Sequence, residues 1–191
     1  MKKTLLILFF VLIPLAFWLG IKISQYQTSR NGLVAGSKER FEYLAKQSSN
    51  RCGLLGSEIV TSMSDKDRIQ GSCCSPMDIN AYQEQVEGLR KYAKISQIPK
   101  DPYDISVSLA KELLEYQKSL TLTSEQQEVY NEAMGLAKEG GPCCCRCWRW
   151  DAFEGQAKYL ITRRNFKSDE IAKVWDLEDG CGGGGHIQEH G

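Results

Sequence analysis

Four of the eight cysteines of this chain fall within five consecutive positions, and they are Cys143, Cys144, Cys145 and Cys147. A free cysteine can fill a core as a small hydrophobe, but its reactivity toward metals, oxidants and other thiols usually decides its role. Three adjacent thiols followed at once by a fourth are poorly placed to be independent core fillers. We therefore expect the chemistry of the chain in this segment. The other cysteines are Cys52, Cys73, Cys74 and Cys181.

Clustered thiolates predict a site for a soft metal ion, because thiolate ligands select Cu(I), Zn or iron–sulfur clusters over hard cations. Cys143, Cys145 and Cys147 would share one face of an extended segment, whereas Cys143, Cys144 and Cys147 would converge in a first helical turn. In either case three thiolates can meet at one ion. The expected cofactor is Cu(I) or Zn. Two methionines that can add thioether ligands for Cu(I), although core packing is their commoner role, are Met63 and Met77.

Further ligands lie outside this segment. Cys181 can supply a fourth thiolate, because the glycines that follow it leave the backbone free to fold back. His186 and His190 are spaced to share a helix face, but histidines in a terminal tail are more often disordered than ligating.

Cys73 and Cys74 are expected to form a second group of ligands, with Cys52 and Met77. Short connections make the helices of a bundle alternate in direction, so the helix starts near residues 76 and 151 should lie at opposite ends. Cys181 should then join the cluster of residues 143–147.

Two other interpretations of the cysteines stay open. Cys144 and Cys147 have the C-x-x-C spacing of a thiol–disulfide exchange centre, although the βαβ context of such centres is missing. An even number of cysteines also suits a disulfide-stapled structural module outside the cytoplasm, although neighbouring cysteines cannot pair with each other without strain. With only two tail histidines available, no catalytic nucleophile pair is convincing, so we favour a protein that is not an enzyme.

The string Pro142–Cys147 resembles the P-C-Y-C-G-C motif that names a family of uncharacterised, membrane-attached bacterial proteins. Cys144 stands in place of the tyrosine of that motif and Arg146 in place of its glycine. The resemblance covers six residues. It implies a cysteine-centred role linked to metal and no established reaction.

The N-terminus predicts attachment to a membrane. Lys2 and Lys3 precede an apolar run over residues 5–23, and no small-x-small cleavage triplet follows it. Residues 1–24 are therefore expected to form a transmembrane signal-anchor helix, with the basic end in the cytoplasm and a single-pass, extracytoplasmic body. The 24 basic and 24 acidic residues balance, so no nucleic-acid partner is expected, and the sequence names no protein partner.

Behind the anchor we expect a linker over residues 25–36, a helical cysteine-rich domain over 37–180 and a Gly/His-rich tail over 181–191. The domain shows helical periodicity and no sustained strand alternation, which predicts an all-α, compact bundle of four or five helices. The expected helices cover residues 37–47, 76–98, 105–120, 123–139, 151–164 and 168–179, the first of them short. The expected helix caps are Ser75, Asp104, Thr123, Asp151 and Ser168. Trp148 and Trp150 are expected in the core, and Arg146 and Arg149 on a solvated face.

Overall fold

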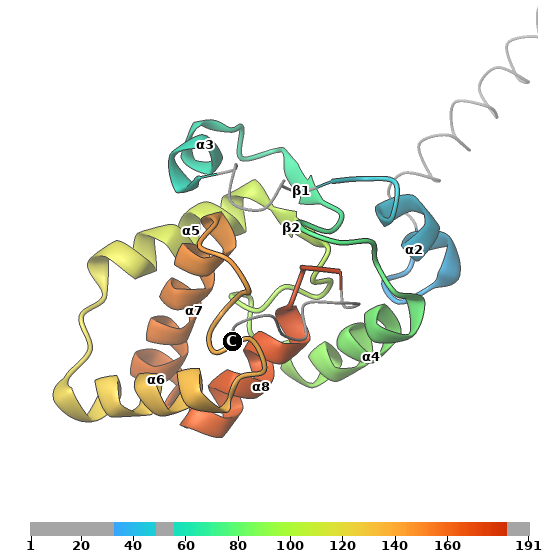
Figure 1. The fold of residues 1–191 in the computed structure, drawn as a ribbon. Helices are drawn as coiled ribbons and strands as arrows, with labels where there is room; N and C mark the ends of the chain where they lie inside the picture. The colour runs from blue at the N-terminus through green and yellow to red at the C-terminus, as the bar shows by residue number, and fades with distance from the viewer. Residues whose placement is uncertain (1–32, 49–55, 183–191) are drawn as a thin grey trace, which may run out of the picture. The chain divides into compact units, whose positions relative to one another are not determined.

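The structure is a computed structural model, and it describes residues 33–48 and 56–182. These residues are mostly helical, which confirms the predicted fold class in its main feature (Figure 1). From Ala35 on they belong to one compact unit. The elements are α2 (Lys38–Leu44), α3 (Ser57–Ser62), β1 (Arg68–Gln70), α4 (Ile79–Leu89), the 3-10 helix η1 (Arg90–Tyr92), β2 (Asp104–Ser106), α5 (Val107–Ser119), α6 (Ser124–Leu136), α7 (Trp148–Arg164) and α8 (Ser168–Glu178).

The fold is not purely helical, because it also contains a two-stranded antiparallel sheet. Strand β1 pairs with β2, and Ile69 stands opposite Ile105. Both isoleucines are buried. Each strand has only three residues, which is too short to produce the alternation by which a strand is recognised in a sequence.

One predicted helix start is right, and at two others a distant group takes the predicted capping side chain. Thr123 and Gln126 form the expected capping box at the start of α6. Helix α4 begins at Ile79 with Asp78 as its cap, instead of Ser75. The Ser75 hydroxyl donates instead to the backbone oxygen of Cys181, 2.6 Å away.

Asp104 does not cap α5, because its carboxylate accepts hydrogen bonds from Arg40 and Arg68 within the sheet region. Ser106 caps that helix. Helix α7 begins three residues before Asp151. Helix α8 has Lys167 at the cap position, so Ser168 is its first residue.

The helical core is built around the long helix α7. Helix α5 lies along α7, and α6 packs against α8 (Figure 1). Gly155 permits the first of these contacts, because a Cβ atom there would lie 1.9 Å from the backbone oxygen of Leu113 in α5. Helix α4 also contacts α8, and α3 lies over α5 and α7.

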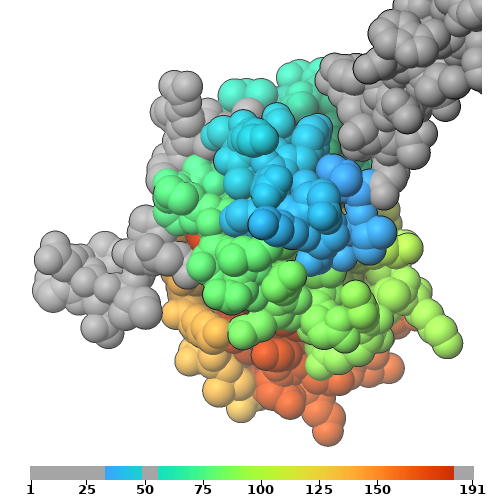
Figure 2. Space-filling model, turned by 90° about the vertical axis from the view of Figure 1, so that its right-hand side faces the viewer, coloured from blue at the N-terminus to red at the C-terminus, as the bar shows by residue number. Residues whose placement is uncertain are grey.

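Helix α2 closes a second, smaller apolar cluster. Leu44 of α2 packs there with Tyr82 and Val86 of α4 and with Tyr103. Figure 2 shows this part of the surface, with the light blue atoms of α2 beside the green atoms of the α4 region.

Of the four aromatic and basic residues at the start of α7, three lie where the sequence predicts. Trp148 and Trp150 are buried, and Arg146 is exposed. Arg149 is fully buried, so its predicted solvated position is wrong. Its guanidinium lies over the rings of Trp148 and Phe153 and donates to the backbone oxygen of Pro102 at 2.8 Å. Flat aromatic faces and a carbonyl oxygen thus replace the water that we expected around it.

The predicted signal-anchor helix lies outside the described residues. Within residues 33–48 and 56–182, none of the helices has the length and apolar character needed to cross a membrane.

Candidate metal centre

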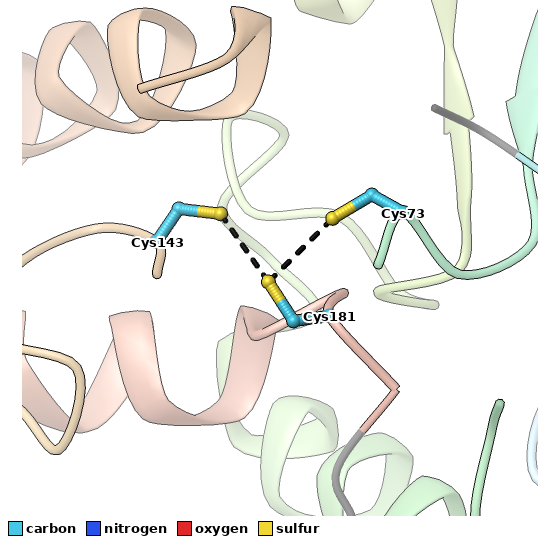
Figure 3. A group of neighbouring side chains, drawn as sticks. All are labelled: Cys73, Cys143 and Cys181. Carbon is cyan, nitrogen blue, oxygen red and sulfur yellow. Dashed lines mark hydrogen bonds between the residues drawn. The ribbon is translucent and has the colours of Figure 1, made fainter. Parts of the chain in front are cut away.

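Three segments that are far apart in the sequence bring seven cysteines together. Cys73 and Cys74 precede α4, the cluster of residues 143–147 precedes α7, and Cys181 follows α8. Figure 3 shows one side chain from each segment, Cys73, Cys143 and Cys181, with their sulfur atoms turned toward one another. The site therefore exists only when the three segments are assembled.

Backbone hydrogen bonds hold the first and last segments side by side. The amide of Cys73 donates to the oxygen of Gly180 at 3.0 Å, and the amide of Ser75 donates to the oxygen of Cys181 at 2.9 Å. The amide of Asp78 extends this ladder to the oxygen of Gly182 at 3.2 Å. Gly182 has φ +107°, and a Cβ atom there would lie 2.2 Å from the oxygen of Ser75, so the approach requires glycine.

The middle segment is not helical. The amide of Cys147 donates to the oxygen of Cys145 at 2.9 Å, and α7 begins only at Trp148. The alternative that put Cys143, Cys144 and Cys147 in a first helical turn is therefore wrong. Cys143, Cys145 and Cys147 gather their sulfur atoms in one group, as the extended alternative predicts.

Contacts between sulfur atoms run through the whole site. Cys144 and Cys181 are closest, with 2.8 Å between their sulfur atoms, and the sulfur atoms of Cys73 and Cys74 are 3.2 Å apart. Cys181 lies 3.5 Å from both Cys73 and Cys143. Cys74 lies 3.9 Å from both Cys144 and Cys145.

Several groups of three cysteines in the described residues have sulfur atoms that all lie within 4.8 Å of one another, and four of these groups together include all seven described cysteines. We call them the four triads. Their arrangement can hold metal, because the ligand atoms already converge from separate segments of the fold. The triads are Cys73–Cys143–Cys181, Cys73–Cys74–Cys145, Cys74–Cys144–Cys181 and Cys143–Cys145–Cys147.

The site has a buried side and a partly exposed side. Cys73, Cys143, Cys147 and Cys181 are 2–3% exposed and belong to the main hydrophobic core. Cys74, Cys144 and Cys145 have intermediate exposure, so this side of the site reaches the surface.

Neighbouring thiols set the acidity of the site. Contacts with Cys144 and the other surrounding thiols lower the pKa of Cys143, because they donate to its sulfur. The contact with Cys143 raises the pKa of Cys73, Cys144 and Cys145, and burial raises the pKa of each further. A bound ion therefore has to displace protons from the thiols whose pKa is raised.

The structure corrects the predicted separation into two sites. Cys74 is in contact with Cys144 and Cys145, so the cysteines of residues 73–74 and 143–147 form one composite site. The two-site prediction assumed a short connection between antiparallel helices. Instead α4 ends at Leu89, and the chain passes through η1, residues 93–103 and β2 before α5 begins. The predicted approach of Cys181 to the cluster is confirmed.

For four other predicted ligands the structure shows no part in this group or does not describe the residue. Cys52, His186 and His190 lie outside the described residues. Met77 packs against the apolar cluster that contains Tyr82, which agrees with the commoner role of methionine.

The C-x-x-C pair is divided between different triads. Cys144 belongs with Cys74 and Cys181, whereas Cys147 belongs with Cys143 and Cys145. None of the seven described cysteines is joined in a disulfide. The described site thus offers converging thiols, as metal binding requires.

Sequence reasoning missed the buried cation beside the site. Arg149 follows Cys147 by two residues, and its guanidinium packs so closely on Gly180 that a Cβ atom there would lie 2.4 Å from Cζ. Its Nε and Nη1 atoms have no hydrogen-bond partner among the described residues. The only signal in the sequence was the position of this arginine between two core tryptophans.

Comparisons with known proteins add no relative: no family model, no curated protein and no solved structure matches the chain significantly. The resemblance to the P-C-Y-C-G-C family stays a prediction. The function has to be argued from the arrangement of the thiols.

Proposed function

We propose that this protein binds soft metal ions through its composite thiolate site and that Cu(I) is the preferred ion. The observation that carries the proposal is the convergence of seven sulfur atoms, from three distant segments, into four triads within 4.8 Å. Thiolates favour Cu(I) and Zn over hard cations. Holding or delivering an ion requires only ligands and no catalytic group, and this is the role that we propose for the protein.

The number of sulfur atoms in each group favours Cu(I) over Zn. Structural zinc sites are almost always tetrahedral, and four thiolates at a bond length of about 2.3 Å stand roughly 3.8 Å apart. The groups that the described residues offer at mutual distances below 4.8 Å, the four triads, have three sulfur atoms each. Three-coordinate thiolate sites suit a soft monovalent ion better than they suit Zn.

The setting that we propose is outside the cytoplasm. Residues 1–24 would anchor the chain in the membrane, with the metal-binding body beyond it. The resemblance to membrane-attached P-C-Y-C-G-C proteins supports the same setting.

A thiol–disulfide exchange protein is the second candidate. The 2.8 Å between the sulfur atoms of Cys144 and Cys181 favours it, because this is the closest sulfur pair and needs little movement to form a bond. The exchanging pair would then be Cys144 with Cys181, in place of the C-x-x-C pair.

One experiment separates the two functions. The full chain is purified without oxygen, loaded with Cu(I) or with Zn in parallel, and treated with an alkylating reagent before peptide mapping. We expect Cu(I) to protect Cys74, Cys144 and Cys181, the members of one triad, together and more strongly than Zn does. Exposure to air without metal is the control. Absence of metal protection, with a disulfide between Cys144 and Cys181 that dithiothreitol reverses, would overturn the metal-binding proposal in favour of exchange.

A further inference from the structure

We propose that the site holds one cluster of four Cu(I) ions with bridging thiolates, in place of a single ion. This inference rests on the proposed function and specifies its stoichiometry. It follows from the way in which the four triads share their members.

Sharing of sulfur atoms connects all four triads. Within these four triads, which together use all seven described cysteines, five cysteines occur twice and two, Cys144 and Cys147, occur once; the five are Cys73, Cys74, Cys143, Cys145 and Cys181. If each triad holds one three-coordinate ion, five bridging and two terminal sulfur atoms supply the twelve bonds that four ions require. The seven described cysteines thus fill the ligand set with none left over.

A single ion explains the arrangement poorly. A trigonal ion would use three of the seven sulfur atoms and leave four thiols crowded around it, among them buried ones. Three thiolates around one ion at a bond length of about 2.3 Å stand roughly 4 Å apart. The sulfur atom of Cys73 lies 3.2 Å from that of Cys74 in one triad and 3.5 Å from that of Cys181 in another, so it is placed to bridge the ions of both.

The surroundings suit a cluster with excess negative charge. Four monovalent ions leave three of seven thiolate charges uncompensated. The 17-residue helix α7 begins directly after Cys147, and its N-terminus carries a partial positive charge. The buried guanidinium of Arg149 packs on Gly180, the neighbour of Cys181, and two of its nitrogens have no hydrogen-bond partner in the described part of the chain. Both features stabilise the anionic cluster in a place from which water is excluded.

The stoichiometry is tested on the full chain without oxygen. Cu(I) is supplied from a competing chelator, and native mass spectrometry counts the ions bound to each chain. We expect the species with four ions to form cooperatively, and X-ray absorption to show three sulfur neighbours and a nearby copper for each ion. A final count of one ion would overturn the cluster and leave the proposed function standing. No bound copper would overturn both.

Single substitutions test whether the copper ions share sulfur ligands. Cys147→Ser removes a terminal ligand and should lower the count from four to three, and Cys144→Ser should do the same. Cys73→Ser removes a bridging ligand and should lower it to two. Met77→Leu, in the separate apolar cluster around Tyr82, is the control and should keep four. Equal losses in the terminal and bridging variants would contradict the cluster, provided that circular dichroism shows unchanged helix content.

Discussion

The sulfur atom of Cys74 lies 3.9 Å from that of Cys144, although 70 residues separate them in the chain. The contact joins the segment before α4 to the segment before α7. Because of it, the two segments share metal ligands, and a change in one alters what the other can bind.

Replacing Cys143, Cys145 and Cys147 together by serine should leave one ion bound. The variant destroys three of the four triads and spares Cys74–Cys144–Cys181. We expect the copper content to fall from four ions to one, with helix content kept, because the helices bury apolar faces of their own. Elemental analysis and circular dichroism on the same sample measure both quantities. Retention of three or four ions would show that this segment contributes little.

Gly182→Ala should weaken copper binding without touching a thiol. Alanine is strained at φ +107°, and its Cβ would lie 2.2 Å from the oxygen of Ser75, so Cys181 would have to move away from Cys73. We expect a loss of affinity of about tenfold, equivalent to about 1.4 kcal/mol, in a chelator competition.

Gly140→Ala is the matched control, because that glycine also has positive φ, at +66°, but no atom lies within 4 Å of the added methyl group. It should bind copper like the wild type. An equal effect in the two variants would mean that backbone strain alone, and not the approach of the two segments, lowers the affinity.

Gly155→Ala should destabilise the fold. The added Cβ would collide with backbone atoms of α5, 1.9 Å from the oxygen of Leu113 and 2.6 Å from the nitrogen of Gln117. Overpacking of this kind costs about 1–3 kcal/mol in the free energy of unfolding. Gly135→Ala in α6 meets no atom within 4 Å and should instead stabilise the protein by about 0.5–1 kcal/mol. Urea denaturation measures both, and the same sign in both variants would contradict the close contact.

Glu178→Gln should remove a pH dependence of stability. Glu178 is fully buried in α8, and burial raises the pKa of its carboxyl well above the ordinary value of 4.5, against the smaller effect of a hydrogen bond from Gln156. Between 4.5 and that raised pKa, the folded carboxyl keeps a proton that the unfolded one releases. Stability is therefore lost as the pH rises through this interval, by about 1.4 kcal/mol for each unit.

The glutamine variant mimics the protonated acid, so it should be more stable than the wild type above this interval and equal to it near pH 4.5. Unfolding in urea at a series of pH values tests this. Glu128→Gln, on the exposed side of α6, is the control and should follow the wild type. If the free energy of unfolding changes with pH in the same way for the wild type and for Glu178→Gln, this carboxyl is not the source of the pH dependence.

The sequence predicts those parts of the fold that depend on neighbours within one or two helical turns. The capping box of Thr123 and Gln126 is complete within four residues. The apolar stripe of α5 buries Leu113 and Leu114, as its spacing indicates. Such features need no knowledge of the rest of the chain.

Features decided by distant groups could not be predicted in this way. Ser75 has the type and spacing of a cap, but Cys181, 106 residues away, takes its hydroxyl. The carboxylate of Asp104 likewise accepts a hydrogen bond from the distant Arg40 and does not cap α5. The joining of the two thiol groups depends on residues 93–103, whose return path carries no periodic signal.

The ladder between residues 73–78 and 180–182 also has a consequence for the time at which the site forms. Cys181 follows Cys73 by 108 residues, so during synthesis the earlier thiols exist for several seconds before their partner, at about 5–20 residues per second. Contacts of such long sequence separation close late in folding, because much of the chain has to be ordered first. We therefore expect that ions load onto the finished domain, and that a nascent chain stopped before Gly180 offers copper only scattered, oxidation-prone thiols.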